Sequence, residues 1–326
     1  MNMDTKAKSS VGFISAAYMP IGGTETFHRS LIPKLKDFVN LVGFVATAFH
    51  GGDGSKLHVP YSTGVEAAKH LVSQCDTVVV WGIDNLSSII PEDRPKVIFV
   101  HHSDWCSDWN NNNILNQLDI IDEIVCVNLN TAKRISLCGK PTHYIPNCID
   151  HSRIIPSGKQ KELRGIHGIP PTSKIVLFGH RLSEEKRPEL AIEIAKSLPH
   201  NWIMGIAGDG PMRDLVKEQS SRCDNIRLFG MCDSLADWLS ISDCFLSLSK
   251  FEGFGFSVCE AMAAGVPTVS TPTGISIGLT KTLPNDATTS QWVEAIVNSK
   301  IMISSEFILN QFSVDRMTRL WADLLE

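Results

Sequence analysis

Apolar runs of strand length alternate with helical patterns along the chain, and this alternation limits the possible folds more than any other feature. In the first half, the apolar runs lie at 11–17, 41–46, 77–81, 97–101, 123–127 and 142–145. Helical patterns separate most of them, for example at 24–36, 64–73 and 130–137. Alternation of this kind predicts parallel sheets covered by helices, which is an α/β architecture.

The second half repeats the scheme, so two domains are expected. Its predicted strands are 174–179, 202–207, 225–229, 243–248 and 266–270, and its predicted helices are 188–198, 211–221, 233–241 and 257–264. A chain of 326 residues is also too long for one ordinary hydrophobic core. The predicted division is 1–152 for an N-terminal domain, 153–173 for a polar linker rich in proline and glycine, 174–310 for a C-terminal domain, and 311–326 for a C-terminal helix.

Composition excludes several functional classes. The formal net charge is −5, which argues against bulk nucleic-acid binding. No apolar run approaches membrane-spanning length, and the first residues lack a signal-peptide core, so a cytoplasmic protein is expected. Nine cysteines at irregular spacings, without a C-x-x-C pair, favour reduced thiols over a disulfide framework or a zinc site.

The most informative motif runs from Glu252 to Glu260, after an apolar strand and into a helix. Gly253 and Gly255 permit unusual dihedral angles and close ligand approach. The helix that begins near Ser257 offers amide groups and its positive dipole end to phosphate oxygens. Glu260 lies among apolar residues, where a carboxylate needs hydrogen-bond donors. Ribose hydroxyls would supply them, and the alternative is that Glu260 caps a neighbouring loop.

A second group of charges follows the predicted strand 174–179. Arg181 and Lys186 leave this strand end, where ligands of open parallel sheets bind, and together they would neutralise a diphosphate. The competing interpretation is a solvated surface loop in which Glu184 and Glu185 pair with Lys186 and Arg187.

Two weaker motifs lie in the N-terminal half. Gly22 and Gly23 precede a predicted helix, as in a phosphate-approach turn. His101 and His102 end a predicted strand, where one of them would stabilise charge or donate a hydrogen bond to a sugar, although a structural histidine is the commoner case. The chain has no Asp-x-Asp sequence, so no metal is expected. The turn at Gly22 and Gly23 is not G-x-G-x-x-G, and no acidic residue ends the second predicted strand, so nicotinamide binding is disfavoured and no cofactor is expected.

Residues 174–272 resemble the donor-binding domain of glycosyltransferase family 4, whose members have the GT-B fold. Four segments are similar to motifs of this family: FGHRLSEEKRPEL, IAGDGPMRDL, NIRLFGMC and KFEGFGFSVCEAMAAGVPTVSTPTG. The last segment is similar to the family's Glu-x7-Glu motif. In the first half, PIGGTE, FVHHSD and YIPNCID are also similar to family motifs. The resemblance implies two Rossmann-like domains facing a central cleft, with the C-terminal helix crossing back to the N-terminal domain.

The resemblance also implies roles for individual residues. Arg181 and Lys186 would bind the donor diphosphate, and Glu260 would bind the ribose. Glu252 and the amides of Gly253, Phe254, Gly255 and Phe256 would hold the transferred sugar and its phosphate. Gly23 would let the N-terminal domain close on the phosphates, and either His101 or His102 would face the donor sugar.

Three positions depart from the family pattern. His180 and Arg187 each replace a usual glycine, and the stretch after Gly274 is short and lacks the family's usual acidic residue and its second glycine turn.

The expected function is that of a retaining, metal-independent hexosyltransferase of polysaccharide biosynthesis. Its donor is a nucleotide-diphosphate sugar, and its acceptor is a glycan, a lipid-linked molecule or a small molecule. The expected location is the cytoplasm, with peripheral contact at the inner membrane face as an option. The alternatives are a non-catalytic GT-B scaffold subunit or, less favoured, a sugar-nucleotide epimerase.

Overall fold

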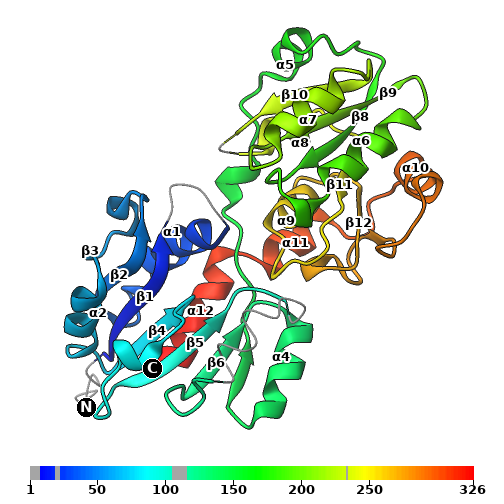
Figure 1. The fold of residues 1–326 in the computed structure, drawn as a ribbon. Helices are drawn as coiled ribbons and strands as arrows, with labels where there is room; N and C mark the ends of the chain where they lie inside the picture. Colours follow the sequence, from blue (N-terminus) through cyan, green and yellow to red (C-terminus); the bar gives the residue numbers. More distant parts are fainter. Residues whose placement is uncertain (1–7, 19–22, 105–115, 233) are drawn as a thin grey trace. The chain divides into compact units, whose positions relative to one another are not determined.

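The structure, a computed structural model, describes residues 8–18, 23–104, 116–232 and 234–326. It divides the chain into two compact units (Figure 1). Unit 1 comprises Met1–Cys148 with Val314–Glu326, and unit 2 comprises Ile149–Ser313. Each unit contains a parallel sheet with helices packed against it, so the predicted α/β class is confirmed.

Within the described residues, unit 1 has a seven-stranded sheet in the order β3-β2-β1-β4-β5-β6-β7. All of its strand pairs are parallel. The strands are β1 (Ser10–Tyr18), β2 (Asn40–His50), β3 (Tyr61–Thr63), β4 (Thr77–Trp81), β5 (Lys96–His101), β6 (Glu123–Cys126) and β7 (Thr142–Tyr144). The helices are α1 (Gly23–Leu35), α2 (Val65–Val72), α4 (Leu129–Ile135) and α12 (Val314–Leu325), with short 3-10 turns η1 (Gly54–Leu57), η2 (Leu86–Ser88) and η3 (Ser136–Cys138).

The C-terminal helix α12 belongs to unit 1, although its sequence follows unit 2. It packs beside α1 (Figure 1). The rings of Trp321 and Phe27 lie 6.3 Å apart, and Lys34 forms an ion pair with Asp315 at 2.5 Å. Trp321 is 1% exposed, so α12 completes the hydrophobic core of unit 1 on this side.

Unit 2 has a six-stranded sheet in its described residues, in the order β10-β9-β8-β11-β12-β13. The strands are β8 (Lys174–Gly179), β9 (Trp202–Ala207), β10 (Ile226–Gly230), β11 (Cys244–Ser247), β12 (Thr268–Ser270) and β13 (Lys281–Thr282). The helices are α5 (Gln160–Ile166), α6 (Pro188–Lys196), α7 (Arg213–Ser220), α8 (Ala236–Leu239), α9 (Phe256–Ala263), α10 (Thr289–Val297) and α11 (Ser305–Gln311), with 3-10 turns η4 (His151–Ile154), η5 (Glu184–Lys186) and η6 (Gly274–Ser276).

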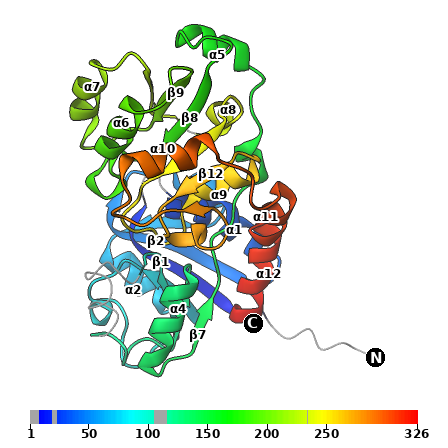
Figure 2. The ribbon, with the colours of Figure 1, turned by 90° about the vertical axis from the view of Figure 1, so that its right-hand side faces the viewer.

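Two groups of helices cover the sheet of unit 2. Helix α6 contacts α7 and α10, whereas α9 contacts α11, as Figure 2 shows. Local sequence explains several helix starts: Pro188 is the first residue of α6, and Thr288 with Gln291 forms a capping box at α10. Trp292 and Phe178 are completely buried in the core of this unit.

The structure differs from the predicted linker at 153–173. Unit 2 begins at Ile149, and residues 160–166 form helix α5. No residue of α5 is buried, and its seven residues contain only two large apolar side chains, Leu163 and Ile166, which are too few for periodicity to predict the helix. The edge strands β3 and β13 were also missed, because their sequences, YST and KT, contain no run of apolar residues.

Candidate functional site

Strands β8 and β11 are parallel neighbours in the sheet of unit 2, and this pairing brings the two charged motifs together. The carboxyl ends of parallel strands meet at one sheet edge, so the loop after β8 lies beside the loop after β11. The amide of Lys250 donates to the carbonyl of Glu185 at 2.8 Å, which joins the two loops directly.

Lys186 and Glu252 form an ion pair at this edge. The ammonium of Lys186 lies 2.5 Å from Oε1 of Glu252, and the hydroxyl of Ser249 donates to the same oxygen at 2.9 Å. The two charged side chains are only 16% and 15% exposed. A lysine ammonium has three donors, so Lys186 can keep this contact and still donate to a phosphate oxygen.

The alternative pairing within the charged loop does not occur. Glu184 pairs with Lys250 at 3.0 Å, and Glu185 accepts from the hydroxyl of Ser183 at 2.5 Å. Arg187 donates to the carbonyl of Leu248 at 2.5 Å and also binds Asn285, 98 residues further along the chain. This ion pair and these hydrogen bonds therefore hold the loop after β8 against the rest of unit 2.

Arg181 is exposed at the end of β8, whereas its neighbour His180 is buried. Nδ1 of His180 lies 3.2 Å from the hydroxyl of Ser257, in the first turn of α9. Burial, with a smaller contribution from the charge of Lys186, lowers the pKa of His180 to about 3. His180 is therefore a neutral residue that links the loop after β8 to the start of α9.

Helix α9 begins at the sheet edge, and its N-cap Gly255 has a left-handed conformation with φ +94°. A residue with a β-carbon is strained in this conformation, which explains the glycine. Phe254 is buried and makes edge-to-face contacts with Phe256 and Phe312, at 5.1 and 5.5 Å between ring centroids. These contacts fix the backbone that leads into α9, where first-turn amides favour an anion.

The short stretch after β12 packs directly on this backbone. The amide of Ile275 donates to the carbonyl of Phe254 at 2.8 Å. Gly274 has φ +54°, and a β-carbon there would lie 2.2 Å from the same carbonyl oxygen. The turn η6 thus supports the glycine-rich loop despite its departure from the family pattern.

Glu260 is 4% exposed and pairs with Arg153 of η4. The guanidinium Nε of Arg153 donates to Oε1 of Glu260 at 2.9 Å. Burial raises the pKa of Glu260, and the charge and hydrogen bond of Arg153 oppose that rise. Arg153 is a partner of Glu260 that the sequence analysis did not identify.

The predicted site residues of unit 1 occupy the ends of two elements. Gly23 is the first residue of α1, and the preceding turn, which includes Gly22, lies outside the described residues. His101 ends β5, is 2% exposed, and has Nδ1 3.0 Å from the carbonyl of Ser103.

His102 instead joins a cluster of rings inside unit 1. Its ring lies edge-on to Phe27, His28 and Trp81, at 5.7 to 6.1 Å between centroids. His28 stacks on Trp81 at 3.9 Å. Burial and the nearby His101 lower the pKa of His102 to about 3, so it too is neutral at physiological pH. The structure thus gives the two histidines different surroundings.

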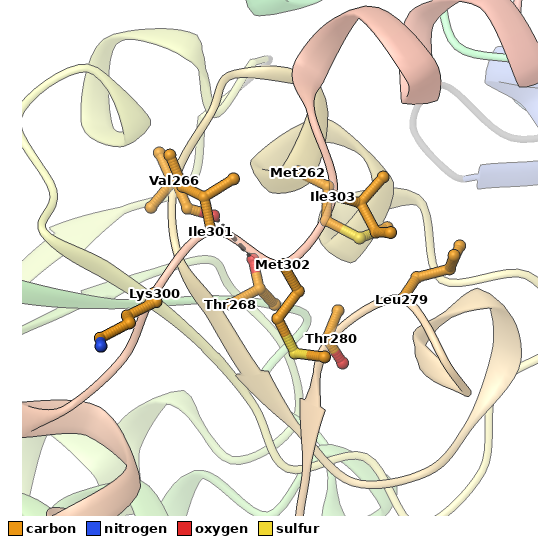
Figure 3. A pocket seen from close by; sticks show the side chains of 9 residues that line it. All are labelled: Met262, Val266, Thr268, Leu279, Thr280, Lys300, Ile301, Met302 and Ile303. Atoms are coloured by element: carbon orange, nitrogen blue, oxygen red, sulfur yellow. Dashed lines mark hydrogen bonds between the residues drawn. The ribbon is translucent and has the colours of Figure 1, made fainter.

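A pocket elsewhere in unit 2 does not coincide with this edge. Figure 3 shows its lining side chains, which are mostly apolar and come from the end of α9, from β12 and from the segments around Leu279 and Met302. The lining residues include Met262 but none of the predicted site residues. The pocket is therefore not the predicted diphosphate site.

Sequence reasoning found the charged residues of the edge but missed their partners. Ser249 and Arg153 lie outside the recognised motifs, and although Ser257 lies inside the Glu252 to Glu260 motif, nothing in the sequence pairs it with His180, because such contacts depend on the tertiary fold. Among the residues that the structure describes, no group of three histidine, cysteine or acidic side chains is arranged to hold a metal ion. No described helix is long and apolar enough to cross a membrane.

Two parallel α/β units of this kind are the architecture of the GT-B glycosyltransferases, and the fold prediction is confirmed at this level. The chain matches Anabaena HepE in complex with UDP-glucose with a TM-score of 0.80 and 16% identity, over 97% of this chain and 99% of that one. A glycosyltransferase from Rickettsia africae matches with a TM-score of 0.79 and 16% identity, over 97% and 98% of the two chains.

Sequence comparisons also find similarity to glycosyltransferases. Residues 159–281 match the family model described as glycosyl transferases group 1. A lipopolysaccharide core biosynthesis mannosyltransferase of Rhizobium meliloti is 28% identical over 165 residues, which cover 47% of this chain and 46% of the relative. An N-acetyl-α-D-glucosaminyl L-malate synthase of Bacillus anthracis is 28% identical over 166 residues, covering 49% and 43%. The chain spans less than half the length of these curated relatives.

Proposed function

We propose that this protein is a retaining glycosyltransferase that moves a hexose-type sugar from a nucleotide-diphosphate sugar to an acceptor. The observation that carries the proposal is the convergence of Lys186, Glu252 and the start of α9 at one sheet edge of unit 2. The family match includes all three, since it extends over residues 159–281. The UDP and UDP-glucose named for Anabaena HepE make a uridine nucleotide the first donor to test.

In the proposed reaction, an acceptor hydroxyl oxygen bonds to C1 of the donor sugar while the bond from C1 to the β-phosphate oxygen breaks. Negative charge grows on the departing oxygen, where Lys186 and Arg181 stabilise it. Attack on the same face as the leaving group retains the anomeric configuration. The departing phosphate takes the proton of the acceptor hydroxyl, so no separate general base is required.

The other predicted residues hold the donor in this proposal. Glu260 accepts hydrogen bonds from the ribose hydroxyls, and the amides of Gly253 to Phe256 bind phosphate oxygens. Glu252 binds the sugar, Gly23 allows close approach to the phosphates, and one of His101 and His102 donates to the sugar.

The acceptor is a glycan, a lipid-linked molecule or a small molecule. The names of the relatives, a lipopolysaccharide core mannosyltransferase among them, favour a glycan of polysaccharide biosynthesis. We place the reaction in the cytoplasm, with peripheral contact at the inner membrane face if the acceptor is lipid-linked.

Donor hydrolysis tests the proposed activity. A thermal-shift screen of nucleotide-sugars identifies the donor first, because a ligand that binds only the folded state raises the melting temperature. Release of nucleoside diphosphate from that donor is then measured without acceptor. Slow release is expected from the enzyme, whereas binding without any release, with or without a panel of acceptors, would indicate the alternative, a non-catalytic scaffold subunit.

A further inference from the structure

Arg153 has a fixed backbone at the start of unit 2. The carboxylate of Asp150 accepts from the amide and the hydroxyl of Ser152, at 2.9 and 2.8 Å, and caps the turn η4 that contains Arg153. The hydroxyl of Ser234 donates to the carbonyl of Arg153 at 2.8 Å. The backbone of Arg153 is therefore held from both sides, which fixes the point from which its side chain extends.

The contact between the side chains of Arg153 and Glu260 uses one nitrogen of the guanidinium and one oxygen of the carboxylate. Nε of Arg153 donates to Oε1 of Glu260, and the side chains are 31% and 5% exposed. The contact occupies one carboxylate oxygen, and among the described residues no hydrogen bond to Oε2 is found, so Oε2 is left for hydrogen bonds from a ligand. A buried carboxylate with only one protein donor is expensive unless further donors bind it.

Arg153 is also the charged group that faces Glu260. Helix α9 contacts η4, η6, α11, β11 and β12. Burial raises the pKa of Glu260, and Arg153 is the group whose charge and hydrogen bond lower it. Among the described residues, the remaining titratable groups on α9 and these elements are the buried thiols of Cys259 on α9 and Cys244 on β11, His151 two residues before Arg153, and Glu306 at the exposed start of α11.

We propose that Arg153 is a positioning residue that keeps Glu260 charged and orients its second carboxylate oxygen toward the ribose hydroxyls of the donor. This inference rests on the proposed function, because it assumes that Glu260 binds ribose. Arg153 itself does not touch the nucleotide in this account. Its contribution to binding passes entirely through Glu260.

The pH dependence of nucleotide binding tests the proposal. Affinity for the nucleoside diphosphate of the identified donor is titrated by calorimetry between pH 5 and 9 for wild type, Arg153→Met and Arg164→Met. Without Arg153, Glu260 takes up a proton at a higher pH, so the midpoint of the affinity curve should move upward. A neutral acid forms weaker hydrogen bonds than a carboxylate, so binding near neutral pH should weaken about tenfold.

Arg164→Met is the matched control. Arg164 also belongs to unit 2, but it donates to the carbonyls of Pro170, Ser173 and Ile241 and does not contact Glu260. Its loss should leave the midpoint where it is in the wild type. A midpoint that is the same in Arg153→Met and wild type would overturn the proposal, as would equal shifts in both arginine variants.

A double variant separates positioning from direct contact. In an E260Q background, the proposal predicts that adding Arg153→Met changes nucleotide affinity less than twofold. A further loss of tenfold or more would mean that Arg153 binds the nucleotide itself, which contradicts the proposal. The double variant also removes the buried charge, so it should fold even if Arg153→Met alone is unstable.

The pH dependence of unfolding tests the role of Arg153 even if the proposed function fails. If the wild type binds no nucleoside diphosphate, the proposed function fails, and the effect of Arg153 on Glu260 is measured from unfolding. A carboxyl whose folded pKa is raised contributes stability that is lost as pH rises through that pKa. Arg153→Met should extend this loss to higher pH than in the wild type, and identical stability curves would overturn the electrostatic role.

Discussion

At the scale of single residues, the pair of Lys186 and Glu252 connects the structure to the proposed chemistry. Two sequence motifs 66 residues apart place opposite charges 2.5 Å from each other at a sheet edge. A largely buried cation that is held in an ion pair needs little reorganisation to stabilise new charge on a leaving phosphate. The same residue therefore serves both the local structure and the proposed transition state.

Lys186→Ala should lower turnover by about a hundred- to thousandfold, because electrostatic groups of this type contribute about 3–4 kcal/mol to the transition state. The Michaelis constant for the donor should change little. Arg181→Lys should also be impaired, since an ammonium does not reproduce a two-pronged guanidinium contact. Steady-state kinetics with the identified donor measure both variants.

Lys250→Ala is the control for this prediction. Lys250 belongs to the neighbouring loop and pairs with Glu184, but both side chains are largely exposed, at 46% and 85%. Its removal should leave turnover within about twofold of wild type, as expected for a surface ion pair. If Lys186→Ala were as active as Lys250→Ala, the loop after β8 would not bind the diphosphate.

The neutral, buried His180 predicts a pH-dependent stability. Its folded pKa, about 3, lies below the value near 6.5 expected in the unfolded chain, so its contribution is complete above pH 6.5 and is lost as pH falls toward 3. Between pH 6 and 4, His180→Asn should reduce the slope of unfolding free energy against pH by about 1.4 kcal/mol per pH unit at most. Denaturant unfolding at several pH values measures the slope, and the exposed His200→Asn is the control. An unchanged slope in His180→Asn would mean that this histidine titrates normally.

At the scale of helices and strands, the order of β8 and β11 in the sheet decides where the site forms. The sequence predicted both strands and the charged loops that follow them, because each strand is a continuous apolar run. It did not predict that Ser257 binds His180 or that Arg153 binds Glu260. These contacts join residues 77 and 107 positions apart, and no local pattern encodes them.

Helix α12 could be predicted from its apolar positions, whereas helix α5 could not. The apolar positions Met317 and Trp321 recur with helical spacing and are buried against unit 1. Helix α5 buries no residue, and its place in unit 2 depends on polar contacts such as those of Arg164. Amphipathic patterning therefore predicts helices that complete a core and misses those that lie on its surface.

Trp321→Ala should destabilise unit 1 by about 3–5 kcal/mol, the usual cost of truncating a fully buried aromatic residue. Thermal or denaturant unfolding monitored by circular dichroism measures the effect. Leu137→Ala is the control, because that side chain is 86% exposed and should contribute almost nothing. Equal stabilities of Trp321→Ala and wild type would show that α12 is not a required part of the core of unit 1.

At the scale of the whole molecule, the chain combines two parallel α/β units, and the candidate donor residues are concentrated in unit 2. The absence of an Asp-x-Asp sequence and the presence of Arg181 and Lys186 favour a reaction in which cationic side chains replace a metal ion. Activity should therefore persist in EDTA at close to its untreated level. Complete loss in EDTA, with recovery on adding magnesium or manganese, would contradict this expectation.

Calorimetric titration of a nucleoside diphosphate into wild type, Glu260→Ala and Glu252→Ala tests the central claim most directly, because it asks whether this edge of unit 2 binds the donor nucleotide. Glu260→Ala should lose about 1.5–3 kcal/mol of binding free energy, the worth of charge-assisted hydrogen bonds to ribose. Glu252→Ala should keep most of its affinity for the nucleotide and lose turnover instead. Equal affinities of wild type and Glu260→Ala would contradict the account.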